Sequence, residues 1–216
     1  MTPEATVWAG RFGDAYTERQ RPVPGSNVAF FARALARTFW RPTRILELGA
    51  GSGENIRALH EIYPEASAWA IEVNETAASL ITGARVTVGD LTEVEIPTEC
   101  QPDLVVAKGV LIHIAPEDLH KAYRRLAASS KYVLIAEYFS PQPTAVRYRD
   151  REGLLWKRDF AHEFLLQHPY FRVLDYGFCW RFDAQAPQDD ITWFLLERGP
   201  EPVAAAFDNI LRGVAG

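Results

Sequence analysis

The stretch ILELGAGSGEN, Ile45–Asn55, decides the fold of this chain. Ile45–Leu48 is short and mostly apolar, as a buried strand is, and glycine follows at positions 49, 51 and 53. Glycine adopts backbone angles that other residues resist and lets a ligand approach the main chain closely. In open α/β sheets ligands bind beyond the carboxyl ends of the strands, so the stretch predicts a ligand-binding loop. A tight loop without a ligand is the alternative.

Strands and helices are predicted to alternate around this stretch. Strands are expected at 45–48, 67–73, 85–88, 103–107 and 132–136, and at 171–182 and 191–198 near the C-terminal end. Helices are expected at 26–39, 54–63, 74–82, 116–128 and 160–168, with Ser26 as an N-cap. This order predicts an α/β, Rossmann-like sheet of seven mostly parallel strands whose last two form an antiparallel edge hairpin.

A single domain accounts for the 216 residues. We expect an N-terminal helical arm and helix (1–40), a cofactor-binding core (41–138), a lid insertion (139–168), C-terminal strands (169–200) and a tail helix (201–216). The lid is predicted from its Pro-rich start and its charged, aromatic continuation. The tail is either a dimer contact or a cap, so a monomer and a homodimer both stay open.

Composition excludes several classes of function. The chain is 48% hydrophobic and 24% charged with a net charge of −5, and no Lys/Arg run exceeds two residues, which argues against nucleic-acid binding. No apolar run is long enough for a membrane span, and no signal peptide is recognised. Two distant cysteines and five histidines without ligand spacing predict free thiols and no metal site. A cytoplasmic location is expected.

A second acid indicates which ligand the loop holds. Glu72 ends the second predicted strand, where a carboxylate can accept the hydroxyls of an adenosine ribose. On dinucleotide-binding spacing the third glycine would fall at position 54, which is glutamate and would repel a pyrophosphate. A sulfonium carries positive charge and no phosphate. The spacing and the charge therefore favour S-adenosylmethionine (SAM) over NAD.

The strings ELGAGSG, VGDL (88–91) and DLVVAKGVLIHI (103–114), with Glu72, resemble class I SAM-dependent methyltransferases. The resemblance implies roles for eleven positions. Gly49, Gly51 and Gly53 would form the cofactor loop, Glu47 would support it, Glu72 and Val73 would hold the ribose, Asp90 and Leu91 would flank the adenine, and Lys108, Gly109 and Val110 would line the methionine end.

Longer strings of sequence resemble one family within this class. WAGRFGDAYTERQ, KGVLIHIAPEDL, IAEYFSP and WKRDFAHEF are similar to the pseudaminic acid biosynthesis-associated methylases, over about residues 8–198. At the level of reaction, the chain also resembles enzymes that cyclise SAM to azetidine-2-carboxylate and release methylthioadenosine. Motifs alone do not separate these two chemistries.

Candidate chemistry at the methionine end follows from residue types. Arg19 is our choice for the carboxylate partner, helped by Tyr16, because a guanidinium matches a carboxylate bidentately. Tyr138 and Tyr176 are the aromatic candidates beside the sulfonium and the amine. His113 follows the fourth strand and is the candidate base, with a core or capping histidine as the alternative. Glu137 is weighed as a holder of the lid, and Asp159 as a partner of lid arginines.

Three functions stay open after this reading. Methyl transfer to a small molecule in bacterial sugar or secondary metabolism leads. Intramolecular cyclisation of SAM is the alternative, since it needs a closed aromatic cavity and no second substrate. A non-catalytic SAM-binding module is the third. A nucleic-acid methyltransferase is disfavoured because AKGVL stands where a base-flipping motif would lie.

Overall fold

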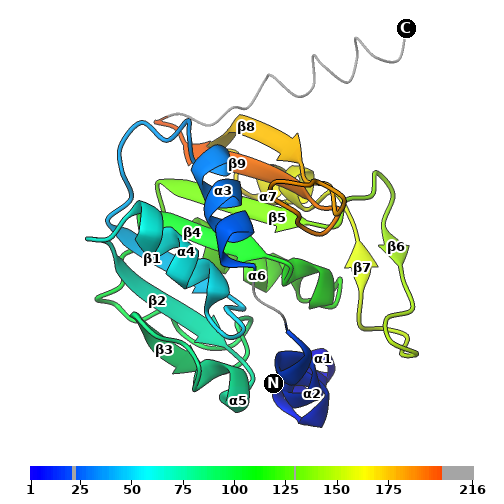
Figure 1. Ribbon diagram of the computed structural model, residues 1–216. Coiled ribbons are helices and arrows are strands. Elements are labelled where there is room, and N and C mark those ends of the chain that lie inside the picture. The colour runs from blue at the N-terminus through cyan, green and yellow to red at the C-terminus, as the bar shows by residue number, and fades with distance from the viewer. Residues whose placement is uncertain (21–22, 129, 201–216) are drawn as a thin grey trace, which may run out of the picture.

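The computed structural model describes residues 1–20, 23–128 and 130–200, and a seven-stranded sheet runs through them. The spatial order is β3-β2-β1-β4-β5-β9-β8 (Figure 1). The first five strands of this order are parallel, and β9 and β8 add an antiparallel edge. The strands are β1 Arg44–Leu48, β2 Ser67–Glu72, β3 Ala84–Val88, β4 Leu104–Lys108, β5 Tyr132–Glu137, β8 Phe171–Phe178 and β9 Thr192–Arg198. The predicted fold class is confirmed.

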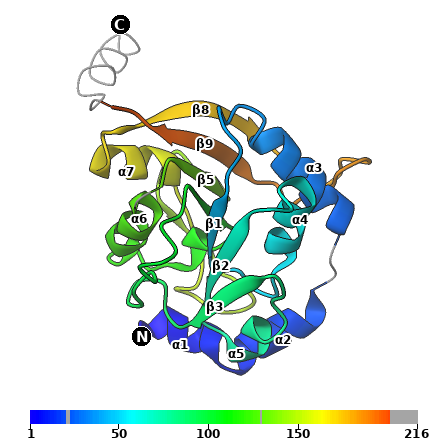
Figure 2. The same ribbon diagram turned by 90° about the vertical axis from the view of Figure 1, so that its left-hand side faces the viewer.

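Helices cover both faces of the sheet. The helices α3 (Pro24–Ala34) and α4 (Glu54–Ile62) pack on one face, and α6 (Leu119–Ala127) and α7 (Phe160–Gln167) on the other (Figure 2). Strands β1, β4 and β5 are buried along nearly their whole length, because each lies between the two helical layers. Apolar residues fill these strands, and Glu47 and Glu137 are the buried acids among them.

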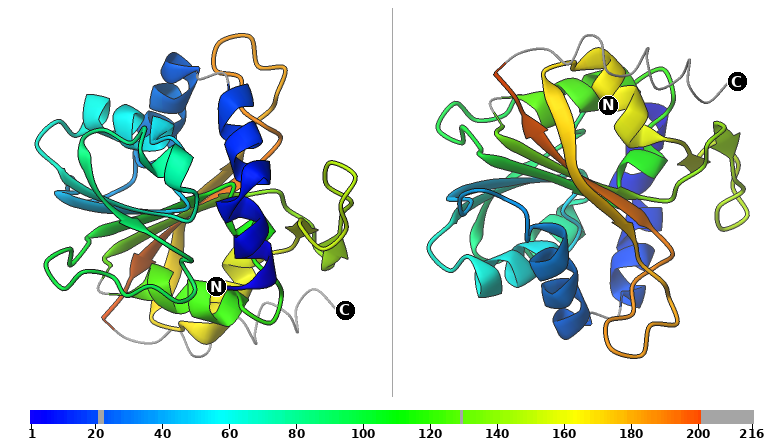
Figure 3. Two further views of the ribbon diagram at one scale, coloured as in Figure 1. Left: turned by 90° about the horizontal axis from the view of Figure 1, so that it is seen from below. Right: turned by 90° about the horizontal axis from the view of Figure 1, so that it is seen from above.

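Two short helices form the N-terminal arm, α1 (Pro3–Ala9) and α2 (Arg11–Arg19). Thr2 caps α1 by accepting a hydrogen bond from the backbone N–H of Ala5, and Pro3 stands at the first helical position, where its missing N–H costs nothing. The arm crosses the end of the sheet beside α5 (Glu75–Ala78), as the view from below shows (Figure 3). The edge that it crosses is the one where ligands bind in such folds.

The segment predicted as a lid insertion, 139–168, contains a small hairpin of two-residue strands, β6 (Thr144–Ala145) and β7 (Trp156–Lys157), which stands beside the main sheet (Figure 1), and then α7. Two predictions for neighbouring acids are wrong. Glu137 binds the backbone N–H groups of Val110 and Leu111 rather than the lid. Asp159 caps α7 by accepting from the N–H of His162, since a helix start offers unpaired donors, and Arg158 pairs with Glu163 instead.

Some predicted helix boundaries are also wrong. The helix α3 begins at Pro24 with Val23 as N-cap, so Ser26 lies inside the helix and is buried. Proline at the first helical position starts the helix before the serine. The helix expected at 74–82 is the single turn α5, since Asn74 caps it and Gly83 follows soon after with a φ of +80°. The tail helix expected at 201–216 lies outside the described residues.

In the described ranges, no helix has both the length and the apolar character that a membrane crossing requires.

Candidate active site

Two of the three glycines in the loop between β1 and α4 have different surroundings. Gly49 has a φ of +67°, and a Cβ there would lie 2.2 Å from Cγ2 of Val110. Gly51 has a φ of +53°, and a Cβ there would meet nothing within 4 Å. Both angles favour glycine over other residues. Gly49 is therefore needed for packing, whereas Gly51 faces open space on the ligand side.

Glu72 ties the end of β2 to this loop. One carboxylate oxygen, Oε2, accepts the N–H of Gly51 at 2.7 Å, and the other, Oε1, accepts the N–H of Asn74 at 2.9 Å. The side chain is buried, and that burial raises the pKa of Glu72. Each carboxylate oxygen has further lone pairs, so the side chain can still accept hydroxyl protons.

Glu47 supports the loop from below. Its Oε1 accepts a hydrogen bond from the amide of Asn55 at 2.6 Å, and its Oε2 is buried without a partner among the described residues. Burial raises the pKa of Glu47 to about 8. The side chain is therefore mostly neutral at neutral pH.

A cavity of about 510 Å³ opens at the carboxyl edge of the sheet, between the glycine loop, the arm, α3 and the loop that joins β8 to β9. This volume is in the range of sites that hold one drug-sized ligand. Eleven of the predicted site residues line it: Tyr16, Gly49, Gly51, Glu72, Val73, Asp90, Leu91, Lys108, Gly109, Val110 and His113.

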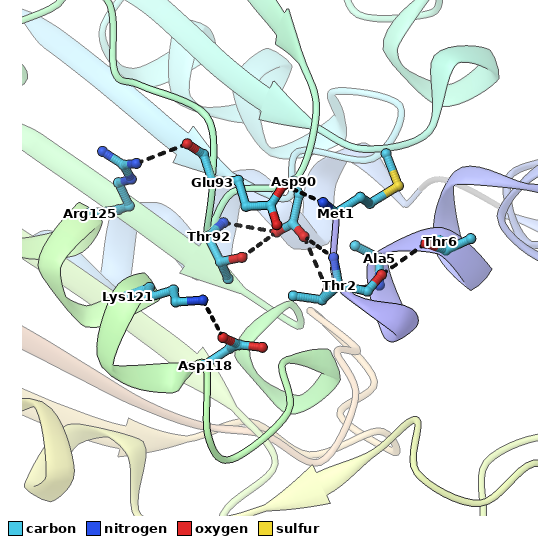
Figure 4. Close-up of polar contacts among 10 residues, drawn as sticks. All are labelled: Met1, Thr2, Ala5, Thr6, Asp90, Thr92, Glu93, Asp118, Lys121 and Arg125. Atoms are coloured by element: carbon cyan, nitrogen blue, oxygen red, sulfur yellow. Dashed lines mark hydrogen bonds and ion pairs between the residues drawn. The ribbon is translucent and has the colours of Figure 1, made fainter.

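Asp90 lines the cavity, but its carboxylate holds the start of the chain. Its Oδ2 accepts from the N–H and the hydroxyl of Thr2, at 2.8 and 3.1 Å (Figure 4). Its Oδ1 accepts from the N–H and the hydroxyl of Thr92, at 2.9 and 2.7 Å. The acid thus fixes the arm to the rim of the cavity.

A second attachment fixes the other end of α1. The amide nitrogen of Asn74 donates to the backbone oxygen of Trp8 at 3.1 Å and to the carboxylate of Asp14 at 3.0 Å. Asn74 is also bound by Glu72, so the arm is connected to the acid at the end of β2. The Nε1 group of Trp8 is buried with no hydrogen-bond partner in the described part of the chain.

His113 lies at the end of the short 3-10 helix η1 (Leu111–His113), in an aromatic cluster. Its ring centroid is 4.5 Å from that of Trp8 and 5.3 Å from that of Tyr148. Its Nδ1 lies 2.6 Å from the carbonyl oxygen of Leu154, which can only accept, so Nδ1 carries the proton and Nε2 is left with a lone pair. Burial lowers the pKa of His113 to about 4. The imidazole is a neutral proton acceptor.

Glu137 positions η1. Its Oε1 accepts the N–H groups of Val110 and Leu111 at 3.0 and 2.8 Å, while its Oε2 is buried and unpaired among the described residues. Burial raises the pKa of Glu137 to about 7. The acid at the end of β5 therefore holds the turn that carries His113.

Five predicted site residues do not line the cavity. Glu47 and Gly53 lie behind its wall, as support for the loop and as the N-cap of α4. Tyr138 donates its hydroxyl to Asp189, which does line the cavity, at 2.9 Å. The predictions for Arg19 and Tyr176 are not supported. Arg19 is exposed at the end of α2, and Tyr176 is 68% exposed, stacked on Phe194 at the far edge of the sheet.

Sequence reasoning missed several lining residues. Trp8 comes from the arm, Asn27 from α3, and Arg181 and Gln188 from the loop that joins β8 to β9. Gln188 donates to Asn27 at 2.9 Å, and Arg181 pairs with Asp190 at 2.6 Å. Asn27 and Gln188 lie 161 positions apart and carry no shared motif, so only the folded chain brings them together. Arg57 also pairs with Glu54, which weakens the charge argument against a pyrophosphate.

Among the described residues, no group of three or more His, Cys, Asp or Glu side chains is placed to hold a metal ion. Cys100 and Cys179 are free thiols.

Residues 45–131 match the model of a family described as a methyltransferase domain. No curated protein matches the chain by sequence. Among solved structures, the mitomycin 7-O-methyltransferase has a TM-score of 0.65 at 15% identity, with 92% of this chain and 61% of that chain covered. The chain thus spans less than two thirds of that protein.

Two further solved structures are similar over most of their length. The 1,6-didemethyltoxoflavin-N1-methyltransferase of Burkholderia thailandensis, bound to its namesake compound and S-adenosylhomocysteine (SAH), has a TM-score of 0.66 at 15% identity, covering 90% of this chain and 87% of that one. The magnesium protoporphyrin IX methyltransferase of Synechocystis, bound to SAM, has a TM-score of 0.64 at 12% identity, covering 92% and 99%. These similarities establish the methyltransferase fold.

Proposed function

We propose that this chain is a SAM-dependent enzyme that transfers a methyl group to a small-molecule acceptor. One observation carries the proposal. A single cavity brings together the glycine loop, the buried acid Glu72 and the neutral imidazole of His113 at the carboxyl edge of a methyltransferase fold. The match of residues 45–131 to a methyltransferase domain supports it, as do the solved structures of the same fold that hold SAM or SAH.

The residues of the cavity fit SAM. Gly51 leaves open space where any other side chain would project, and Glu72 beside it has lone pairs for the ribose hydroxyls. The lining residues Trp8 and Tyr16 offer aromatic rings, which suit a sulfonium. When bound, SAM would supply an electrophilic methyl group on a positively charged sulfur.

The chain's own residues would handle the proton of the acceptor. An acceptor with an O–H or N–H loses that proton as the methyl group arrives, and Nε2 of His113 is the group with a free lone pair to take it. The Nδ1 bond to Leu154 fixes the ring and its tautomer. The ring of Trp8, from the arm, lies 4.5 Å from the ring of His113 on this side of the cavity.

A small acceptor is proposed because of the size of the cavity and the relatives. The volume of about 510 Å³ leaves limited room beside SAM. The mitomycin 7-O-methyltransferase and the 1,6-didemethyltoxoflavin-N1-methyltransferase have this fold and act on small molecules. The resemblance to pseudaminic acid-associated methylases adds sugar metabolism, so we propose bacterial sugar or secondary metabolism as the context.

Cyclisation of SAM is the second candidate. The cavity lies between the arm, α3 and the loop that joins β8 to β9, and a reaction within one bound molecule needs no second pocket. The amine of SAM would attack its own γ-carbon, giving azetidine-2-carboxylate and methylthioadenosine (MTA). Asp189, which lines the cavity and accepts the hydroxyl of Tyr138, is the group that would hold the amine.

Mass spectrometry of the products separates these reactions. Purified protein is incubated with SAM alone and then with panels of nucleotide-sugar and phenolic or heteroaromatic acceptors. SAH together with a methylated acceptor supports methyl transfer. MTA with azetidine-2-carboxylate from SAM alone, above a boiled control, supports cyclisation. If SAM binds but is not consumed under any condition, the proposed enzymatic activity is contradicted, and the chain would be a SAM-binding module.

A further inference from the structure

The last strand of the sheet, β8, exposes apolar side chains on one of its faces (Figure 1). Tyr176 in β8 pairs with Phe194 in β9, which pairs with Ile135 in β5. Ile135 packs in the core beneath α6 and α7, and residues that pair across strands share a face, so Tyr176 points to this side of the sheet. The ring of Phe164 on α7 lies 5.0 Å from that of Phe171 at the start of β8. Further along the strand, Tyr176 is exposed.

Aromatic side chains recur at every second position from Tyr176 onward. Alternate residues of an extended chain share one face, and positions 176, 178, 180 and 182 are all aromatic. The rings of Trp180 and Phe182 are in contact, with their centroids 5.6 Å apart. We call this set the aromatic face: Tyr176, Phe178, Trp180 and Phe182.

The residues between these four face the opposite way. A Cβ on Gly177 would lie 2.7 Å from the ring of Trp193, and Cys179 packs against the core beneath α3. Arg181 lines the cavity. The segment therefore turns one side to the core and the cavity, and the aromatic face to the outside.

The aromatic face is large enough to form the centre of a protein interface. Its four side chains are between 53% and 70% exposed. An aromatic side chain can bury about 150–250 Å², so at these exposures the face offers roughly 500 Å². Apolar patches of this size on a monomer are often functional. A stable interface buries about 800 Å² of each partner, so the aromatic face supplies more than half of that area.

The charged side chains of this segment indicate which partner fits. They are already paired with opposite charges: Arg172 with Glu197, Asp175 with Arg37 and Arg181 with Asp190. A strongly charged protein or an anionic membrane would have to break these pairs to gain its own contacts. A second copy of the chain presents the same uncharged rings and keeps the pairs intact. The aromatic face therefore fits a copy of itself, related by a two-fold axis.

We infer that the aromatic face is the interface of a homodimer, in which it packs on the same face of a second copy. The inference is independent of the proposed function, since it concerns a surface outside the cavity. It also has a consequence for the cavity, because Arg181 and Gln188 belong to the segment and the loop that the interface would hold in place.

The mass of the full chain in solution, measured by light scattering without ligand, tests the inference. At micromolar concentrations the wild type should have twice the 24.3 kDa of one chain. Phe178→Asp should have the mass of one chain, because a two-fold contact would bring two carboxylates together in an apolar interface. Circular dichroism shows whether the variant is folded.

Two further variants complete this test. Phe182→Asp is the second interface variant if Phe178→Asp does not fold, and the same loss of the dimer is expected of it. Leu80→Asp is the matched control. Leu80 is about as exposed as Phe178 but lies between α5 and β3, at the opposite edge of the sheet. Its variant should stay a dimer.

Hydrogen exchange of the wild type locates the interface. Residues 176–182 should exchange more slowly at concentrations where the dimer predominates than after dilution to the monomer, whereas β3 should exchange equally in both.

Three results would overturn the inference. The first is a wild type with the mass of one chain at every concentration. The second is a dimer that persists in folded Phe178→Asp and Phe182→Asp. The third is loss of the dimer in Leu211→Asp with an intact dimer in Phe178→Asp, which would move the contact to the segment 201–216.

Discussion

Glu72 accepts the backbone N–H of Gly51 at 2.7 Å, so the acid at the end of β2 holds the glycine loop at the end of β1. The two features that indicate a nucleoside ligand are therefore one connected structure. The same acid binds Asn74, which in turn holds the arm. Substitution of Glu72 should therefore alter the positions of the loop and the arm as well as the binding of the ligand.

The two glycines of the loop should respond differently to alanine. Gly51→Ala places a Cβ in open space at a φ of +53°, which costs about 1 kcal/mol of backbone strain, and the protein should fold and lose SAH affinity. Gly49→Ala places a Cβ 2.2 Å from Val110 and should cost several times more stability. Thermal unfolding and calorimetry measure both effects. A Gly51→Ala protein that binds SAH normally would contradict the position of the ligand.

His113 should make the folded protein sensitive to acid. Its pKa is lowered from 6.5 to about 4, so between these values the unfolded chain takes up a proton that the native protein refuses. Stability is complete above pH 6.5 and falls as the pH drops toward 4, by up to about 3 kcal/mol. The His113→Gln variant should not show this loss of stability, because glutamine does not take up a proton. Urea unfolding of both proteins between pH 6.5 and 4 measures their stabilities. The same pH dependence in the wild type and in His113→Gln would contradict the burial of a neutral imidazole.

Glu137 should change the stability of the protein with pH in the opposite direction to His113. Its pKa is raised from 4.5 to about 7, so the native state holds its proton more tightly than the unfolded chain does. The stability that this group contributes at low pH is lost as the pH rises from 4.5 to 7, by up to about 3 kcal/mol. Glu137→Gln keeps an oxygen for Val110 and Leu111, and its stability relative to the wild type should rise over that window. Glu137→Ala, which keeps no acceptor, should be less stable at every pH.

The arm should loosen when Thr2 loses its contact with Asp90. Thr2→Val removes the hydroxyl that donates to Asp90 and caps α1. We expect faster amide hydrogen exchange in α1 and α2, unchanged exchange in β1 and β4, and recovery of slow exchange when SAH is added, because the arm lines the cavity. Exchange that rises throughout the sheet would indicate general destabilisation instead.

The sheet and the glycine loop were predictable because their signals are local. Apolar runs fix β1 and β4, and glycine at 49 and 51 marks the turn where the backbone needs positive φ. Glu72 was predictable for the same reason, since it stands at the end of a strand whose neighbour carries the loop.

The rest of the site depends on where distant segments meet. The aromatic side of the cavity comes from Trp8. Its place is set by the bond from Thr2 to Asp90, 88 positions away, and by the bond from Asn74 to the backbone of Trp8, 66 positions away. Arg181 reaches the cavity through the loop that joins β8 to β9, whereas Tyr176 in the same hairpin faces outward against Phe194. A bulge between Val173 and Asp175 shifts the register of β8, and no sequence pattern indicates that shift.

Calorimetric titration with SAH of the wild type, Glu72→Gln and Glu75→Gln tests most directly whether Glu72 and the glycine loop form a SAM site. Glu75 is an exposed acid three residues away and serves as the matched control. We predict one SAH site in the wild type, an affinity lower by about 10- to 100-fold in Glu72→Gln, and no change in Glu75→Gln. Absence of SAH binding by the folded wild type, or equal binding by all three proteins, would contradict a SAM site formed by Glu72 and the glycine loop.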